Sequence, residues 1–254
     1  MAEVSSYATG QPCWADVTSP DVEAAATFYS GLFGWKAARD PRPEAGGYTM
    51  FSRDGKSVAA ASPPQGGGPP SCWTVYLAAD DVDVIAGRIR DAGGNVLMDP
   101  FDVFDAGRMT VASDPAGASF GVWQAGASIG SELSGEPGTM NWAEVQTSDK
   151  TAAQSFYEHV FDYETETMDM GSTGGYVLLQ LNGQPVAGLI QIEPEWGEAP
   201  SNWSVVFQVE DCDAAVAKVQ ELGGSVIREA QTLEGVGRFA VVADPWGAVF
   251  QVIT

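Results

Sequence analysis

The sequence is poor in the residues that most metal sites and nucleophilic sites need. Its 254 residues include one histidine, three cysteines and only 12 Lys+Arg, against 34 Asp+Glu. A single histidine excludes any site within one chain that requires two, such as the two-histidine, one-carboxylate iron site and the two-histidine zinc sites. Cys13, Cys72 and Cys212 are odd in number and far apart, which favours buried thiols in a reducing compartment over a disulfide framework.

Positive charge is equally scarce. The formal net charge is -22 and the basic residues do not cluster, which argues against nucleic acid and anionic membrane surfaces as partners. No apolar run approaches the roughly 20 residues of a membrane-spanning helix, and the first residues lack the basic and apolar regions of an export signal. We therefore expect a cytoplasmic protein, and its acidity favours neutral or cationic ligands.

What the sequence does contain is an internal repeat. The segment CWADVTSPDVEAAATFYSGLFGW, from Cys13, corresponds to NWAEVQTSDKTAAQSFYEHVFDY, from Asn141, and two further segment pairs follow at offsets of 128 to 130 residues. Such self-similarity indicates a tandem duplication. We predict two domains, residues 10–125 and 138–254, joined by the Gly/Ser-rich linker 126–137.

Each predicted domain divides again. Four segments share one order: a short alternating strand, an acidic helix start, an amphipathic helix, and short strands separated by turns. The predicted unit is βαβββ, at about residues 10–65, 71–125, 138–195 and 200–254. For the first helix the pattern favours Ser19 as the N-cap, with Pro20 in the first helical position.

The motifs of these modules resemble those of the vicinal oxygen chelate superfamily, which includes glyoxalases, bleomycin-resistance proteins and extradiol dioxygenases. The resemblance rests on the FYSGLFGW segment at 28–35 and on the DP.G segments at 114–117 and 244–247, and it covers nearly the whole chain. It is greatest for tandem two-domain actinobacterial members. It implies an α+β fold in which two βαβββ modules form a curved eight-stranded mixed sheet around a cavity, twice in this chain.

The resemblance also implies where metal ligands would lie. The positions are Trp14, Thr74 (or Trp73 if the register slips) and Gly121 in the first domain, and Trp142, Ser204 (or Trp203) and Gln251 in the second. An indole has no lone pair for a metal and a glycine has no side chain. We therefore predict no metal and no other cofactor, and we expect the single histidine, His159, to be an exposed helix residue.

Strand alternation places Asp16 on the face of Trp14 and Glu144 on the face of Trp142. The family pattern adds cavity-facing residues, namely Tyr48, Met109 and Trp123 in the first domain and Tyr176, Gln208, Phe239 and Gln251 in the second. We predict aromatic-lined pockets whose rings stack on a flat hydrophobic ligand. Asp16 or Glu144 would accept a hydrogen bond, pair with a ligand cation or act as a general base.

The tryptophans and the two carboxylates can also be interpreted as purely structural residues. The tryptophans Trp14, Trp73, Trp142 and Trp203 are also what repeated core anchors would look like, and the two carboxylates are also what solvated strand ends would carry. We expect Arg108 and Arg238 to form structural ion pairs. Because the halves differ, with Gly121 against Gln251 for example, one cavity can be functional and the other structural.

Two functions fit these residues. The first is a metal-independent protein of the glyoxalase and bleomycin-resistance type that binds a small aromatic natural product or antibiotic, in biosynthesis or self-resistance. The second is a cofactor-free enzyme, such as a hydroxylase accessory, isomerase or cyclase, that acts on a polyketide-like substrate through Asp16 or Glu144. The ligand positions disfavour a metal-dependent lyase or dioxygenase, and a protein-interaction module without a small ligand is a further alternative. We expect a monomer or weak homodimer.

Overall fold

The βαβββ order occurs four times along the chain, as the repeats predict. The structure is a computed structural model that describes residues 3–64, 71–169, 175–197 and 199–254; residues 65–70, between the first two predicted modules, lie outside this description. The first two modules are β1 (Pro12–Thr18), α1 (Val22–Phe33), β2 (Lys36–Arg39), β3 (Thr49–Arg53), β4 (Lys56–Ser62), then β5 (Cys72–Ala78), α2 (Val82–Asp91), β6 (Asn95–Val103), β7 (Gly107–Ser113) and β8 (Ser119–Ala125). The last two are β9 (Met140–Thr147), α3 (Lys150–Phe161), β10 (Glu164–Met168), β11 (Tyr176–Leu181), β12 (Gln184–Gln191), then β13 (Asn202–Gln208), α4 (Cys212–Glu221), β14 (Ser225–Leu233), β15 (Gly237–Ala243) and β16 (Val249–Ile253).

Each pair of modules builds one eight-stranded mixed sheet. The strand orders are β2-β3-β4-β1-β5-β8-β7-β6 and β10-β11-β12-β9-β13-β16-β15-β14. The modules meet through a central antiparallel pair, β1 with β5 in the first sheet and β9 with β13 in the second. This topology confirms the predicted fold of two glyoxalase-like domains.

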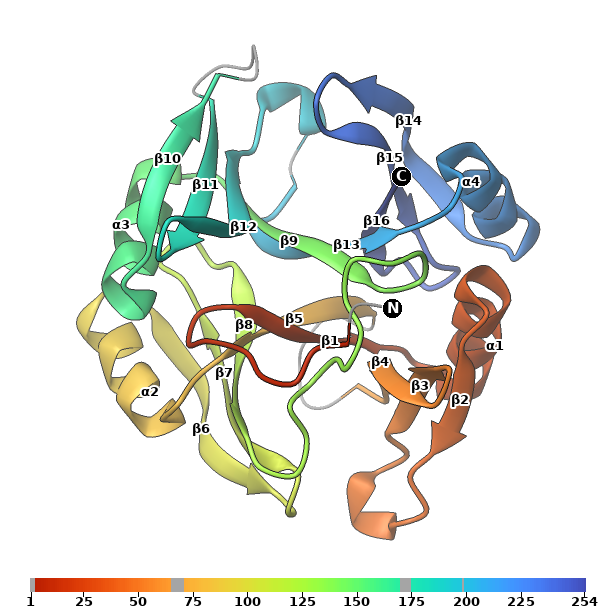
Figure 1. Cartoon of the computed structure of the whole chain (residues 1–254), viewed down its shortest axis with the longest axis horizontal. Helices are drawn as coiled ribbons and strands as arrows, with labels where there is room; N and C mark the ends of the chain where they lie inside the picture. The colour runs from red at the N-terminus through yellow and green to blue at the C-terminus, as the bar shows by residue number, and fades with distance from the viewer. Residues whose placement is uncertain (1–2, 65–70, 170–174, 198) are drawn as a thin grey trace.

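The two sheets lie back to back. Each curves into a U whose hollow opens away from the other sheet, while α1 lies beside α4 and α2 beside α3 (Figure 1). Alternate residues of the central strands, such as Val17, Val75, Val145 and Val205, are fully buried in a core that both halves share. Because apolar burial is the main stabilising term in folding, the shared core binds the two domains into one unit.

Two buried hydrogen-bond chains cross between the domains. The Trp73 indole N–H donates to the Tyr29 hydroxyl (3.0 Å), which donates to the Asp244 carboxylate of the other domain (3.0 Å). The second chain is its counterpart: Trp203 donates to Tyr157 (2.7 Å), and Tyr157 donates to Asp114 (3.2 Å). Trp73 and Trp203 are therefore core anchors, and the hollows receive Thr74 and Ser204 instead.

Four aspartates start the four helices. Asp21, Asp81, Asp149 and Asp211 are the N-caps, and each carboxylate accepts a backbone N–H of the first helical turn. The prediction of Ser19 as N-cap is wrong, because the Ser19 hydroxyl instead accepts from the backbone N–H of Asp21 (3.3 Å).

Side chains at the start of the β7 and β15 strands secure the neighbouring helices. Arg108 pairs with Asp83 of α2 (2.9 Å) and Arg238 pairs with Asp213 of α4 (2.7 Å), which confirms the predicted ion pairs. No helix in the described ranges has the length and hydrophobicity of a membrane span.

Residues 126–139 connect β8 to β9 and run through the hollow of the first sheet (Figure 1). The backbone N–H of Ser131 donates to the carbonyl of Cys13 (2.8 Å), and that of Glu132 donates to the carbonyl of Ser57 (2.8 Å). Leu133 is fully buried and forms a β-bridge with Glu3. The connection is therefore anchored to the first domain around Ser131, Glu132 and Leu133, and its last residues, Gly138 and Thr139, bond to Gln208 of the second domain.

Candidate functional site

A hydrogen-bond chain on the floor of the second hollow ends on a carboxylate. The Trp142 indole N–H donates to the Tyr176 hydroxyl (2.8 Å), which donates to Glu144 Oε2 (2.9 Å). Trp142 and Glu144 are neighbours on one face of β9, and Tyr176 opens β11. Burial, followed by the neighbouring Glu144 carboxylate, raises the pKa of Tyr176 well above its ordinary value, so the phenol stays protonated as a donor.

Amide side chains complete the surroundings of Glu144. Its Oε1 accepts from Gln251 Nε2 (2.8 Å) and from Gln146 Nε2 (3.0 Å), and Gln251 also donates to the Ser204 hydroxyl (3.1 Å). Gly188 lies opposite Glu144 in the sheet, and a β-carbon there would stand 1.7 Å from the Tyr176 hydroxyl. The absence of a side chain at 188 is what allows Tyr176 to reach the carboxylate.

The first hollow holds a related but more deeply buried group. The Trp14 indole donates to the Tyr48 hydroxyl (3.1 Å), and the hydroxyls of Tyr48 (3.2 Å) and Tyr76 (3.1 Å) both donate to Asp16 Oδ2. Burial raises the pKa of Asp16 to about 6, against the opposing effect of the two tyrosine hydrogen bonds. Only 6% of Asp16 is exposed.

Side chains of the protein itself fill the first hollow. Cys13, Trp14, Ala60, Tyr76 and Ala78 form a buried cluster, against which Tyr7, Tyr48, Met50, Met109 and Trp123 pack. Tyr7 is further held by its hydroxyl, which donates to the carbonyl of Ser131 in the connecting segment (2.7 Å). This space is therefore occupied by the N-terminal residues and by the connection between the domains.

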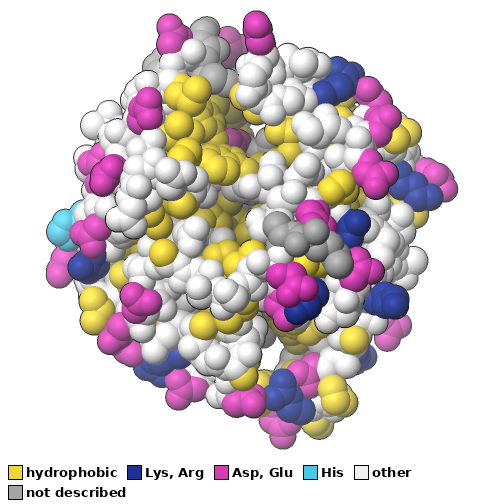
Figure 2. All heavy atoms as spheres, viewed as in Figure 1, with side chains coloured by type: hydrophobic (Ala, Val, Ile, Leu, Met, Phe, Trp, Pro, Cys, Tyr) yellow, Lys and Arg dark blue, Asp and Glu magenta, His cyan; other side chains and the backbone are white. Residues whose placement is uncertain are grey.

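The second hollow is more open. Trp142, Glu144 and Tyr176 are only partly buried, in contrast to Trp14 and Asp16. Figure 2 shows a depression lined by hydrophobic side chains over β11, β12 and β9. The physical reason is that the connecting segment exists once in the chain and lies over the first sheet. The second hollow is the better candidate for a binding site.

The other predicted site residues fall into two groups. Met109 and Trp123 lie opposite each other on β7 and β8 and join the filled cluster of the first hollow. Phe239 lies opposite Ile253, next to Gln251 on the same face of the second sheet. Gln208 is at the end of β13, where its backbone bonds to Gly138 and Thr139, and its side chain does not join the Glu144 group.

The family's metal positions come together in each hollow, as the register shows. Thr74 lies opposite Asp16 and Ser204 opposite Glu144, while Gly121 and Gln251 lie on the next strands. Trp14 and Trp142 offer an indole N–H with no lone pair and Gly121 offers nothing, which leaves only the neutral hydroxyls of Thr74 and Ser204 and the amide oxygen of Gln251. These side chains do not fit a metal ion. Among the described residues, no group of three or more His, Cys, Asp or Glu is arranged to hold one.

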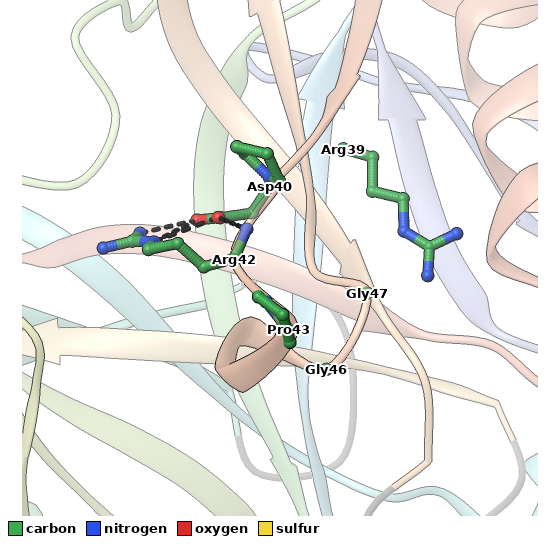
Figure 3. Close-up of a pocket in the computed structure, with 7 residues that line it drawn as sticks. Arg39, Asp40, Arg42, Pro43, Gly46 and Gly47 are labelled. Atoms are coloured by element: carbon green, nitrogen blue, oxygen red, sulfur yellow. Dashed lines mark hydrogen bonds and ion pairs between the residues drawn. The ribbon is translucent and has the colours of Figure 1, made fainter.

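Other candidate positions lie outside the hollows. His159 is exposed on α3, as predicted. A surface pocket of about 370 Å³ lies at the β2–β3 connection, where Arg42 is engaged by Asp40 and Arg39 extends away from that pair (Figure 3). The Arg42 guanidinium also lies over the ring of Phe104, with 4.0 Å to the ring centroid. The Arg42 guanidinium in this pocket is therefore already engaged by Asp40 and Phe104.

Sequence reasoning missed three residues of these groups. Gln146 shares the face of Trp142 and Glu144 by strand alternation, so the period-two pattern could have found it. Tyr76 shares the face of Thr74 in the same way. The role of Gly188 depends on the approach of Tyr176 from a neighbouring strand, for which the sequence carries no signal.

Comparison with known proteins agrees with the fold over the whole chain. The Glyoxalase/Bleomycin resistance protein/Dioxygenase superfamily matches residues 13–122 and 139–252. The putative glyoxylase CFP32 of Mycobacterium tuberculosis is 40% identical, over 100% of this chain and 98% of its own. The anthracycline biosynthesis protein DnrV of Streptomyces peucetius is 42% identical, over 98% of this chain and 95% of its own.

Solved structures share the same architecture. The Mn(II)-bound glyoxalase of Novosphingobium aromaticivorans has a TM-score of 0.66 at 14% identity, over 96% of this chain and 81% of its own. The 2,3-dioxygenase LapB of Pseudomonas sp. KL28 has a TM-score of 0.66 at 13% identity, over 96% and 92%. These identities show the fold alone, whereas the matches above extend to sequence. The chain belongs to the glyoxalase/bleomycin resistance protein/dioxygenase superfamily.

Proposed function

We propose that the protein binds a small, flat, hydrophobic aromatic molecule in the hollow of the second sheet, without a metal. The ligand stacks against Trp142 and Tyr176, and its polar group bonds to the Glu144 and Gln251 pair. Apolar hollows with a few convergent polar groups are the usual form of small-molecule sites.

One observation carries this proposal. The two hollows contain equivalent Trp, Tyr and carboxylate groups, but the first is packed with side chains of the protein, while Trp142 and Glu144 stay partly exposed. A partly exposed tryptophan beside a hydrogen-bonded carboxylate leaves aromatic surface that a planar ligand would cover. The first domain, on this proposal, serves as structural support.

The relatives favour an aromatic polyketide as the ligand. Both DnrV of Streptomyces peucetius and DauV of Streptomyces sp. (strain C5) are named as anthracycline biosynthesis proteins, and each is 42% identical to this chain. Anthracyclines are fused-ring aromatic molecules, and such a frame suits stacking on an indole. We therefore place the protein in natural-product biosynthesis or self-resistance.

A calorimetric titration with 1,4-dihydroxyanthraquinone tests the proposal. We expect one binding site per chain, an affinity unchanged after dialysis against EDTA, and a loss of about tenfold or more in Trp142→Ala. Absence of binding by this probe and by a panel of other fused-ring aromatics would contradict the proposal. Binding that EDTA abolishes and zinc, iron or manganese restores would contradict its metal-free part.

A cofactor-free enzyme is the second candidate, and Asp16 is the observation that favours it. A carboxyl group with a pKa of about 6, bonded to the Tyr48 and Tyr76 hydroxyls, is suited to accept a proton near neutral pH. Product analysis of a polyketide incubated with the wild type, Asp16→Asn and Glu144→Gln separates the two candidates. Conversion that either substitution abolishes would favour the enzyme, whereas an unchanged polyketide would favour the binding protein.

A further inference from the structure

Among the residues that the structure describes, one arginine of this acidic chain has no carboxylate partner. The sequence has eight arginines, and seven of them lie within 4.0 Å of an Asp or Glu oxygen. Arg228, on β14, is the exception within the described residues, although it is partly buried. In a protein with a net charge of -22, a partly buried guanidinium without a carboxylate needs a reason.

The sheet register places Arg228 in line with the candidate site. Arg228 lies opposite Val241, and Val241 lies opposite Gln251. Gln251 is alongside Val206, which lies opposite Trp142. Residues directly opposite each other project from the same face of a sheet. Ala240 and Val242, which flank Val241, are buried in the core, so Val241 and its row project into the hollow.

The distance along this row suits an elongated ligand. Neighbouring strands are about 4.8 Å apart, so along the curved sheet Arg228 is about 10 Å from the strand of Gln251 and about 19 Å from that of Trp142. Val241, Gln251 and Val206 lie between them in this row, so the curved floor is apolar except for one amide. A fused-ring molecule that lies on this floor has one end near Glu144 and Gln251 and the other near Arg228.

The equivalent row of the first domain shows that the fold itself does not need this charge. Its residues are Met98, Val111, Gly121, Tyr76 and Trp14, in the same register and with β-bulges at the same places. Met98 therefore occupies the position of Arg228 in an otherwise equivalent strand. Only the second domain has an arginine at this position. In the same way, it has Gln251 where the first domain has Gly121.

The guanidinium of Arg228 makes a cation–π contact with the ring of Trp196. The Arg228 Cζ lies 4.6 Å from the centroid of the Trp196 ring, and Trp196 belongs to the 3-10 turn η2 (Pro194–Trp196) between β12 and β13. A cation–π contact uses the flat face of a guanidinium and leaves its N–H edges for hydrogen-bond acceptors. The arginine is thus positioned, and no described residue accepts a hydrogen bond from its guanidinium.

We propose that Arg228 is a second anchor of the ligand site and binds an oxygen acceptor of the ligand. The ligand class is then an oxygenated fused-ring aromatic molecule. One end carries an anionic or carbonyl oxygen for Arg228, and the opposite end carries a hydroxyl or amine donor for Glu144. This inference rests on the proposed function, because it extends the same hollow.

Two probes that differ at one end test the inference. The first is 6-aminoanthraquinone-2-carboxylate, which has an amine at one end and a carboxylate at the other, and the second is 2-aminoanthraquinone, which lacks the carboxylate. We expect the wild type to bind the first about tenfold more tightly, since hydrogen bonds between charged groups have this magnitude. Arg228→Met should remove the preference and leave the affinity for 2-aminoanthraquinone unchanged.

The controls separate this inference from the function on which it rests. Arg90→Met, which removes one positive charge from the surface ion pair with Asp99, should keep the preference. Methionine is chosen because Met98 occupies the equivalent position of the first domain. A thermal melt checks that Arg228→Met is folded. Equal binding of both probes by the wild type, or a preference that survives Arg228→Met, would overturn the role of Arg228 alone. Failure of the wild type to bind either probe would overturn the proposed function and this inference together.

Discussion

The ring of Tyr76 lies so close to Gly121 that a β-carbon at residue 121 would stand 2.1 Å from Cδ1 of the ring. The equivalent positions of the second domain hold Val206 and Gln251, alongside each other in the same register. The two hollows therefore differ by a compensating pair of residues. An aromatic ring lies over glycine in the first, whereas the second has a smaller valine beside an amide that donates to Glu144.

The close packing of Tyr76 on Gly121 predicts that substitutions at these two positions have strongly coupled effects on stability. Gly121→Gln should destabilise the protein by about 1–3 kcal/mol or more, because an overpacked core displaces its neighbours. Adding Tyr76→Val should restore most of the loss, since the double variant rebuilds the pair of the second domain. Urea denaturation of the two single variants and the double variant measures the coupling free energy. A Gly121→Gln variant as stable as the wild type would contradict this packing.

Asp16 predicts a specific pH dependence of stability. Burial raises its pKa from 3.8 to about 6, so the folded state holds this proton more tightly than the unfolded state. The resulting stabilisation is complete below about pH 4 and is lost as the pH rises through 6. Asn at this position avoids the buried charge. The stability of Asp16→Asn relative to the wild type should therefore rise by up to about 3 kcal/mol between pH 4 and pH 8.

Denaturation curves at several pH values check this expectation. Asp80→Asn, at an exposed position, controls for the loss of one negative charge. If Asp16→Asn and the wild type differ by the same amount at pH 4 and pH 8, the carboxyl group is not desolvated as the structure indicates.

The hydrogen bonds between the domains predict that the two domains unfold together. Tyr29→Phe leaves the Asp244 carboxylate without the donor it receives from the other domain, and Tyr157→Phe does the same to Asp114. Each substitution should cost about 1–3 kcal/mol, the usual penalty for removing a partner of a buried polar group. Calorimetry should still show one transition, because the core is continuous. Two separate transitions would show that the domains unfold independently.

Substitutions of the equivalent tyrosines Tyr176 and Tyr48 test which hollow binds the ligand. Tyr176→Phe removes the donor to Glu144 and should weaken binding of 1,4-dihydroxyanthraquinone about fivefold to tenfold, since the freed carboxylate loses its orientation. Tyr48→Phe makes the same change in the first hollow and should leave the affinity unchanged. Calorimetric titration measures both. The reverse pattern would move the site to the first domain.

Repeats and alternation predicted the fold and much of the content of the hollows. The period of two along the first strand put Asp16 on the face of Trp14, and the structure joins them through Tyr48. Whether Trp73 or Thr74 faces the hollow depended on a one-residue register, and only the packing of Trp73 on Tyr29 decides it. Register shifts by one residue exchange the two faces of a strand, which is why spacing alone left this open.

The difference between the two hollows could not be predicted in this way. It depends on the path of residues 126–139 over the first sheet and on the insertion of Tyr7, and neither follows from periodicity. In the sequence, Phe28 and Tyr29 of α1 indicate only that the segment is repeated. The hydrogen-bond partner of Tyr29, Asp244, is 215 residues away, and only tertiary structure brings the two together.

A crystal structure of the protein with 1,4-dihydroxyanthraquinone would show which hollow binds the ligand. We expect one molecule per chain, stacked on Trp142 beside Glu144 in the second hollow, with the first hollow still filled by Tyr7 and Tyr76. A ligand found in the first hollow, or none in either hollow at a saturating concentration, would contradict this expectation.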